Sequence, residues 1–158
     1  MSLLSHLLAP QTTTFLNGGS HDALANEHDF AKKFPLRIIV ADDDYISRRT
    51  LRFMLEGLGY DVETVENGHE CLAAMLAKPF DVVLLDLDMP VMDGIDCARA
   101  ARAARINTII VALTAVPVQI ARLASLGAGI NSYLEKPVVM DELKQALRVA
   151  SFNHLGSK

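Results

Sequence analysis

Short apolar runs alternate with segments of helical periodicity along most of the chain. Five of these runs have strand length and are bounded by turn residues, namely 36–41, 60–65, the run that ends at Asp86, 108–113 and 131–134. Between and after them, apolar residues recur three or four positions apart, as on the buried face of an amphipathic helix. The pattern therefore predicts five β-α units in succession.

The predicted helices end or begin at typical boundary residues. The first carries Leu51, Met54, Leu55 and Leu58 on one face and stops at Gly59, since glycine commonly follows a helix C-terminus. The second follows the turn Asn67-Gly68. The others are expected at 95–105, at 118–126 and at 141–150, with Leu143, Leu147 and Ala150 facing inward in the last.

Five consecutive β-α units favour an α/β fold with a parallel sheet between two layers of helices. Right-handed crossovers leave few topologies. We expect a flavodoxin-like (βα)5 three-layer sandwich whose five-stranded parallel sheet has the order 2-1-3-4-5. Its switch point, where such folds bind ligands, lies between strands one and three.

The ends of the chain lack this regular pattern. Residues 1–34 are predicted to be an irregular, mobile extension, residues 35–151 the folded domain, and residues 152–158 a tail. Within the extension, Leu3, Leu4, Leu7 and Leu8 would share one helical face before Pro10. They could form a short docking or dimerisation helix, but a mobile tail is the favoured interpretation.

Composition narrows the function classes. The 158 residues are 51% hydrophobic and carry a net charge of −4, which argues against nucleic-acid binding. Residues Arg99, Arg102 and Arg105 could form a basic stripe, but a solvated helix face is favoured. No apolar segment approaches the ~20 residues that span a bilayer, and the N-terminus lacks the basic region of a signal peptide.

The cysteine pattern indicates the redox state of the cellular compartment. Cys71 and Cys97 lie in unrelated segments and make neither a CxxC motif nor a disulfide framework. A reducing compartment, and hence a cytoplasmic location, is expected.

Acidic residues follow two strands that the predicted topology makes neighbours. Asp42 and Asp43 end the first strand, and Asp86 ends the third in the segment Phe80-Asp-Val-Val-Leu-Leu-Asp86. Carboxylates placed a few ångströms apart repel one another. A divalent cation relieves this repulsion, and all-oxygen ligation suits Mg²⁺.

Two further polar residues end strands at the same edge. Thr114 follows the fourth strand, and Lys136, before Pro137, follows the fifth. A carboxylate nucleophile, a metal, a hydroxyl and an ammonium together favour phosphoryl transfer, because the cations neutralise the oxygens of the transferred group.

These motifs, in this order, resemble the receiver domain of two-component response regulators over about residues 36–150. The resemblance implies that Asp86 is the phospho-acceptor and that Lys136 pairs with the phosphoryl group. It implies Mg²⁺ ligation by Asp43, Asp86 and the backbone carbonyl of Asp88, with Asp42 assisting through water or a second-shell contact.

The resemblance also implies a switch and partners. Thr114 would move toward the phosphoryl group and Tyr133 would turn inward with it. A histidine kinase or histidine phosphotransfer protein would be the donor and dock on the first helix around Ile46, Ser47 and Arg48. Output would pass to an unknown protein target, with a homodimer possible and neither nucleic acid nor membrane as partner.

Other assignments remain open. Asp44 could strengthen metal binding or cap the first helix. Val116 stands where the family tunes dephosphorylation, and an apolar residue there predicts slow hydrolysis. The chain would then be no enzyme beyond its own phosphorylation and slow dephosphorylation.

Two other functions are alternatives to the hypothesis of a phosphorylated receiver domain. One is a receiver-like interaction module that is never phosphorylated. The other is a haloacid-dehalogenase-type phosphatase, for which Asp86-Leu-Asp88 would supply the nucleophile and acid, although no cap segment is evident.

Overall fold

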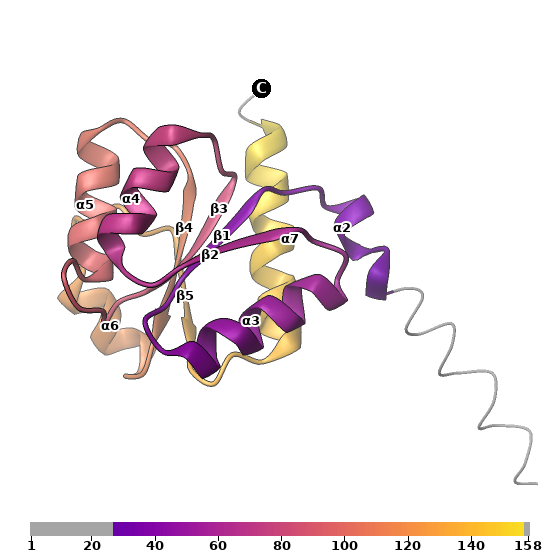
Figure 1. Cartoon of the computed structure of the whole chain (residues 1–158), viewed down its shortest axis with the longest axis horizontal. Helices are drawn as coiled ribbons and strands as arrows, with labels where there is room; N and C mark the ends of the chain where they lie inside the picture. Colours follow the sequence, from indigo (N-terminus) through magenta and orange to yellow (C-terminus); the bar gives the residue numbers. More distant parts are fainter. Residues whose placement is uncertain (1–26, 157–158) are drawn as a thin grey trace, which may run out of the picture.

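The computed structural model describes residues 27–156 and contains one parallel sheet of five strands (Figure 1). The strands are β1 (Ile38–Ala41), β2 (Val62–Val65), β3 (Val82–Asp86), β4 (Ile109–Thr114) and β5 (Ser132–Glu135). Their order is β2-β1-β3-β4-β5, which confirms the predicted flavodoxin-like topology. In this order β1 and β3 are neighbours, with Ala41 beside Leu85.

Helices cover both faces of the sheet. They are α2 (Phe30–Lys33), α3 (Tyr45–Gly57), α4 (Gly68–Ala77), α5 (Gly94–Ala103), α6 (Val118–Ala124) and α7 (Met140–Gly156). Figure 1 shows α4, α5 and α6 on one side of the sheet and α3 and α7 on the other. Alternate residues of each strand enter two separate cores, so Val82 and Leu84 pack toward α3 and α7, while Val83 and Leu85 pack toward α4 and α5.

Polar side chains start three of the helices. Asp44, Asn67 and Asp93 each accept a hydrogen bond from the backbone N–H three residues later, at the beginnings of α3, α4 and α5. Such N-caps satisfy donors that the helix leaves unpaired. Asp44 therefore caps α3, which resolves one of the two roles considered for it.

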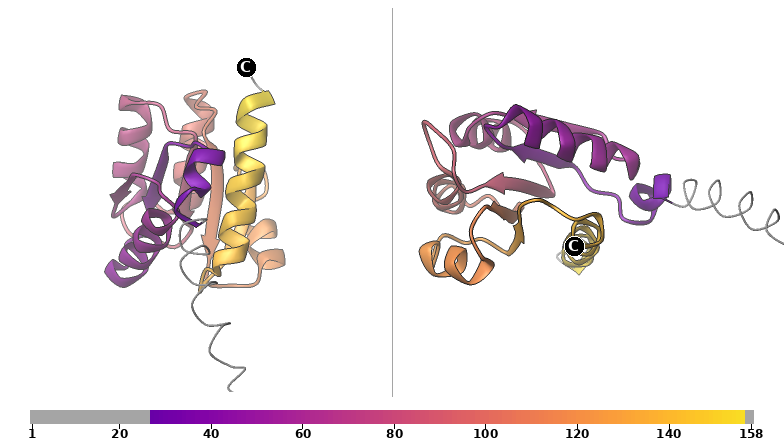
Figure 2. Two further views of the ribbon diagram at one scale, coloured as in Figure 1. Left: turned by 90° about the vertical axis from the view of Figure 1, so that its right-hand side faces the viewer. Right: turned by 90° about the horizontal axis from the view of Figure 1, so that it is seen from below.

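The C-terminal helix is longer than the sequence pattern predicts. Helix α7 continues past Ala150 to Gly156 and spans the height of the domain (Figure 2). Its added turns are held by contacts with distant residues: Phe152 packs edge-on against Phe34, and Nε2 of His154 lies 3.4 Å from Oδ1 of Asp81. Tertiary contacts of this kind are invisible in the local periodicity.

Part of the segment predicted to be irregular is also folded. Phe30 on α2 is 7% exposed and packs against the rings of Phe34 and Tyr60, and the N–H of Ala31 donates to the carbonyl of Leu58. These ring contacts and the backbone hydrogen bond anchor the short segment to the core. The leucines of residues 3–8 lie outside the described residues.

One of the arginines expected on a solvated helix face has different surroundings. Arg102 is not on a solvated face: its guanidinium donates to the carbonyls of Ile106, Thr108 and Gly129 and to Oδ1 of Asn131. It thereby ties α5 to the loops before β4 and β5. Arg99, by contrast, is exposed.

The cysteines are also closer than their sequence positions suggest. Cys71 on α4 and Cys97 on α5 are both buried and free, and a hydrogen bond between their thiols raises the pKa of Cys71 and lowers that of Cys97. The pairing follows from the contact between α4 and α5, which the sequence pattern does not reveal.

Within residues 27–156, no helix combines the length and apolar character needed to cross a membrane.

Candidate functional site

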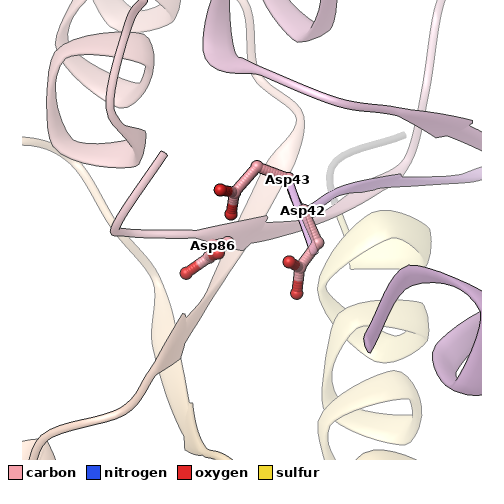
Figure 3. A group of neighbouring side chains, drawn as sticks. All are labelled: Asp42, Asp43 and Asp86. Carbon is pink, nitrogen blue, oxygen red and sulfur yellow. The ribbon is translucent and has the colours of Figure 1, made fainter. Parts of the chain in front are cut away.

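Three carboxylates gather at the carboxyl edge of the sheet. Asp42 and Asp43 follow β1, Asp86 is the last residue of β3, and one oxygen of each lies within 4.8 Å of the others (Figure 3). Because β1 and β3 are hydrogen-bonded neighbours, the strand order itself creates this cluster. The structure thus brings together the three acidic residues singled out in the sequence.

Asp86 is almost completely buried. It is 5% exposed, and its Oδ1 accepts the backbone N–H of Asp88 at 3.1 Å. Burial raises the pKa of Asp86 to about 6, although the Asp88 N–H and the ammonium of Lys136 both favour its charged form. A cation next to Asp86 would offset this cost of burying the charge.

Asp42 and Asp43 differ in their environment. Asp42 is fully buried, and both of its oxygens are engaged, Oδ1 with the N–H of Asp44 at 2.9 Å and Oδ2 with Lys136 at 2.8 Å. Asp43 is exposed, and among the described residues no side chain or N–H bonds to its carboxylate. Of the two, Asp43 is the one with free oxygens to offer an ion.

Lys136 crosses the sheet edge to reach both strands. Its Nζ lies 2.8 Å from Oδ2 of Asp42 and 3.2 Å from Oδ2 of Asp86. Burial alone would lower the pKa of Lys136, but the hydrogen bond to Asp42 and the charges of both carboxylates raise it. The ammonium is therefore a fixed positive charge beside Asp86. Its backbone is held as well, since the N–H of Lys136 donates to the carbonyl of Thr114.

The hydroxyl groups of Thr114 and Tyr133 both form contacts with groups other than Asp86. Oγ1 of Thr114 donates to the carbonyl of Val116 at 3.0 Å and accepts the Val116 N–H at 3.1 Å, so this hydroxyl is not bonded to Asp86. The Tyr133 hydroxyl contacts Oγ of Ser125, the residue that follows α6. Thr114 ends β4 at the edge of the sheet, and neither it nor Tyr133 contacts Asp86 in these arrangements.

Two residues that shape the site were given minor or different roles in the sequence analysis. A Cβ on Gly94 would stand 2.2 Å from the carbonyl oxygen of Asp86, so only glycine lets α5 begin there. Arg48, expected on the docking surface, has only 12% of its side chain exposed and donates to the carbonyl of Asp42 and to Glu66. Arg48 therefore fixes the loop after β1. The DG turn at Asp93-Gly94 was a visible signal for the first of these, but nothing local marks the second.

The donor set fits a hard divalent cation. Asp42, Asp43 and Asp86 offer oxygen only, from a partly open edge, and such ligands suit Mg²⁺. A buried carboxylate, neighbouring oxygen ligands and an ammonium at one edge are groups of the kind that phosphoryl-transfer sites use.

Comparisons with known proteins identify the family of the chain. The family model described as the response regulator receiver domain matches residues 38–148. The response regulator MprA of Mycolicibacterium vanbaalenii is 39% identical over 114 residues, which are 72% of this chain and 49% of that protein. The chain thus matches about half the length of this relative.

Solved structures are similar in the same region. One is the receiver domain of a sensor histidine kinase from Pseudomonas aeruginosa, described with a magnesium ion coordinated in the active site cleft (TM-score 0.67, 32% identity, 73% of this chain and 97% of that one).

Another is the receiver domain of the response regulator Ssk1 of Saccharomyces cerevisiae, solved with the histidine phosphotransfer protein Ypd1 (TM-score 0.67, 26% identity, 71% of this chain and 86% of that one). The fold, the acidic edge and these matches agree, and the chain belongs to the response regulator receiver domain family.

Proposed function

We propose that this chain is a phospho-accepting receiver that takes a phosphoryl group onto Asp86 and signals through contacts with other proteins. The observation that carries the proposal is the position of Asp86 between the ammonium of Lys136, 3.2 Å away, and the open carboxylate of Asp43. A binding module would have no need for a buried carboxylate whose pKa is raised to about 6 by burial.

In the proposed reaction, one Asp86 oxygen attacks the phosphorus of a phosphohistidine. The P–O bond to Asp86 forms as the P–N bond of the donor breaks, and the donor imidazole leaves with the bonding electron pair. Lys136, already held by Asp42, neutralises a phosphoryl oxygen without having to move far. The phosphoryl group is transferred once, so the chain acts on itself and turns over no substrate.

The metal position follows from the same residues. Asp43, Asp86 and the backbone carbonyl of Asp88 would hold Mg²⁺, and Asp42, whose oxygens are already hydrogen-bonded, would act only through water or as a second-shell contact. When bound, the ion would supply positive charge to the phosphoryl oxygens. The magnesium described in the Pseudomonas aeruginosa receiver supports this assignment.

The donor is proposed to be a histidine kinase or a histidine phosphotransfer protein, as the yeast complex supports. The surface that fits it is a small groove of about 180 Å³ between α3 and the loop after β5, which reaches Lys136 and is lined in part by Ile46, Ser47 and Pro137. Ile46 is 67% exposed on this surface. Arg48 would contribute through the loop it fixes and not by direct contact.

The proposed switch uses Thr114 and Tyr133. Phosphorylated Asp86 would attract the Thr114 hydroxyl away from Val116, and Tyr133 would turn into the space that Thr114 leaves. The added negative charge on Asp86 would thus favour one of two conformations of Thr114 and Tyr133. The surface changed in this way is formed by α6, β5 and α7, which would bind the downstream target.

The test is the intact mass of the full chain after incubation with acetyl phosphate and Mg²⁺, for wild type and Asp86→Asn. We expect one added phosphoryl group on the wild type, none on the variant, and none with a chelator. Absence of the adduct while Mg²⁺ binds would overturn the proposal and favour an interaction module. Hydrolysis of a phosphate ester beyond one equivalent would favour a phosphatase instead.

A further inference from the structure

Helix α6 is attached to strand β5 by polar contacts at both of its ends. At its beginning, the N–H of Val118 donates to Oε1 of Glu135 at 2.8 Å, and Pro117 before it offers no side-chain cap. At its end, Ser125 contacts the Tyr133 hydroxyl. Tyr133 and Glu135 are two residues apart, so they project from the same face of β5.

The direction of the Ser125 hydrogen bond follows from its neighbours. Oγ of Ser125 donates its single proton to the carbonyl of Ala121 at 2.7 Å. The Tyr133 hydroxyl must therefore donate to Oγ of Ser125. Because Ser125 is only 2% exposed, water cannot easily replace it as the acceptor.

The ring of Tyr133 is held on a second side. The guanidinium carbon of Arg122 lies 4.9 Å from the centre of the ring, a distance typical of a cation–π contact. Arg122 lies in the last turn of α6, and Ser125 is the residue that caps its C-terminus. Together they fix both the ring and the hydroxyl of Tyr133 against α6.

We propose that Ser125 is a positioning residue that holds Tyr133 in its resting conformation and so restrains the switch until Asp86 is phosphorylated. This inference rests on the proposed function and deepens it. For Tyr133 to turn toward the space beside Thr114, its hydroxyl has to leave Ser125. The strength of that one hydrogen bond sets part of the ratio between resting and switched molecules.

Ser125→Ala tests the proposal with little other damage. The Ala121 carbonyl still accepts the backbone N–H of residue 125, so the substitution leaves no helix carbonyl unpaired. Loss of one hydrogen bond of ordinary strength is expected to shift the resting-to-switched ratio toward the switched form by about three- to tenfold. Ser151→Ala is the matched control, since Ser151 is 3% exposed in α7.

The chain contains three tyrosines and no tryptophan, so 3-fluorotyrosine labelling gives a simple ¹⁹F NMR spectrum, in which Tyr133→Phe identifies the signal. In unphosphorylated protein, we expect Ser125→Ala to move the Tyr133 resonance toward its position in the beryllofluoride-treated wild type. We also expect Ser125→Ala to speed phosphorylation by acetyl phosphate by about three- to tenfold. In a Tyr133→Phe background, the same substitution should leave that rate unchanged.

The outcomes separate this inference from the proposed function. If wild type is phosphorylated but Ser125→Ala changes neither the resonance nor the rate, or does no more than Ser151→Ala, the role of Ser125 is overturned while the proposed function stands. If wild type is never phosphorylated, the proposed function fails. In that case a shifted Tyr133 resonance would show only that Ser125 contacts Tyr133. The role of Ser125 as a restraint on the switch would be overturned together with the proposed function.

Discussion

Nζ of Lys136 lies 2.8 Å from Oδ2 of Asp42, although the two residues are 94 positions apart in the sequence. Asp42 is fully buried, and Lys136 is its charge partner. The same ammonium faces Asp86. Lys136 thus stabilises two buried carboxylates in the unphosphorylated protein, before any reaction takes place.

Replacing Lys136 should therefore cost stability as well as phosphorylation. We expect Lys136→Met to lower the free energy of unfolding by about 3 kcal/mol, because Asp42 and Asp86 are left without their cation. Urea denaturation measures this loss, with Lys136→Arg as the charge-preserving control. A Lys136→Met variant as stable as the wild type would show that the carboxylates do not depend on this ion pair.

Magnesium should stabilise the protein through Asp43. At an Mg²⁺ concentration 100 times its Kd, we expect a gain of about 2.7 kcal/mol over the chelated protein, since only the folded chain presents the cluster. Asp43→Asn should lose most of this gain. Asp44→Asn is the matched control, because asparagine still caps α3. Equal responses of the two variants in a thermal shift titration would contradict ligation by Asp43.

Arg102 should be important for stability although it lies outside the site. Arg102→Met removes a donor shared by three carbonyls and the Asn131 side chain, and we expect a loss of about 2 to 4 kcal/mol in the free energy of unfolding. Arg99→Met, on the same helix but exposed, should change it by less than about 0.5 kcal/mol. Urea titration of both variants distinguishes a structural arginine from a solvated one.

The ion pair of Asp81 with Arg37 predicts a pH dependence of stability. Burial opposes the charge on Asp81, but the hydrogen bonds and charge of Arg37 outweigh it and lower the pKa of Asp81. A carboxyl whose pKa is lowered by folding contributes stability above its unfolded pKa and loses it as the pH falls through the folded one.

Asp81→Asn should accordingly be less stable than wild type at pH 7.5, by about 1 to 3 kcal/mol, with the gap closing below about pH 3.5. His154 also faces Asp81, so His154→Gln serves as the control that keeps Arg37 in place. A gap that stays constant across this range in urea titrations would rule out the ion pair as its source.

The lifetime of the phosphoryl group tests the role of Val116. Its side chain is 45% exposed near Thr114 and has no polar atom to orient an attacking water. We expect the purified phosphorylated protein to hydrolyse slowly, and Val116→Asn to hydrolyse faster because an amide can position water. Intact mass measured over time reports the loss of the phosphoryl group. Loss from the wild type within seconds would contradict this expectation.

The fold could be predicted from the sequence because its signals are local. Apolar runs such as 82–85 and the turn residues between them are enough to fix the alternation of strands and helices, and right-handed crossovers then limit the topology. The acidic cluster follows at once, since the order of the strands places Asp86 beside Asp42 and Asp43. Their roles as acceptor and ligands remain predictions.

The features that could not be predicted depend on distant contacts. Nothing near Arg102 in the sequence indicates that its acceptors lie in two other loops, and nothing near Cys71 points to Cys97. The helical turn at Phe30 forms because Tyr60 and Phe34 receive its ring. In each case the partner is supplied by tertiary packing, which has no periodicity to detect.

Gly94 lets the first turn of α5 lie directly against the end of β3. The space for a Cβ there is taken by the carbonyl of Asp86, so the two backbones are in close contact and leave little room for α5 to approach the sheet. Helix α6 is short and attached to β5 through side chains. We therefore expect phosphorylation of Asp86 to change the surface formed by α6, β5 and α7 while α5 keeps its place.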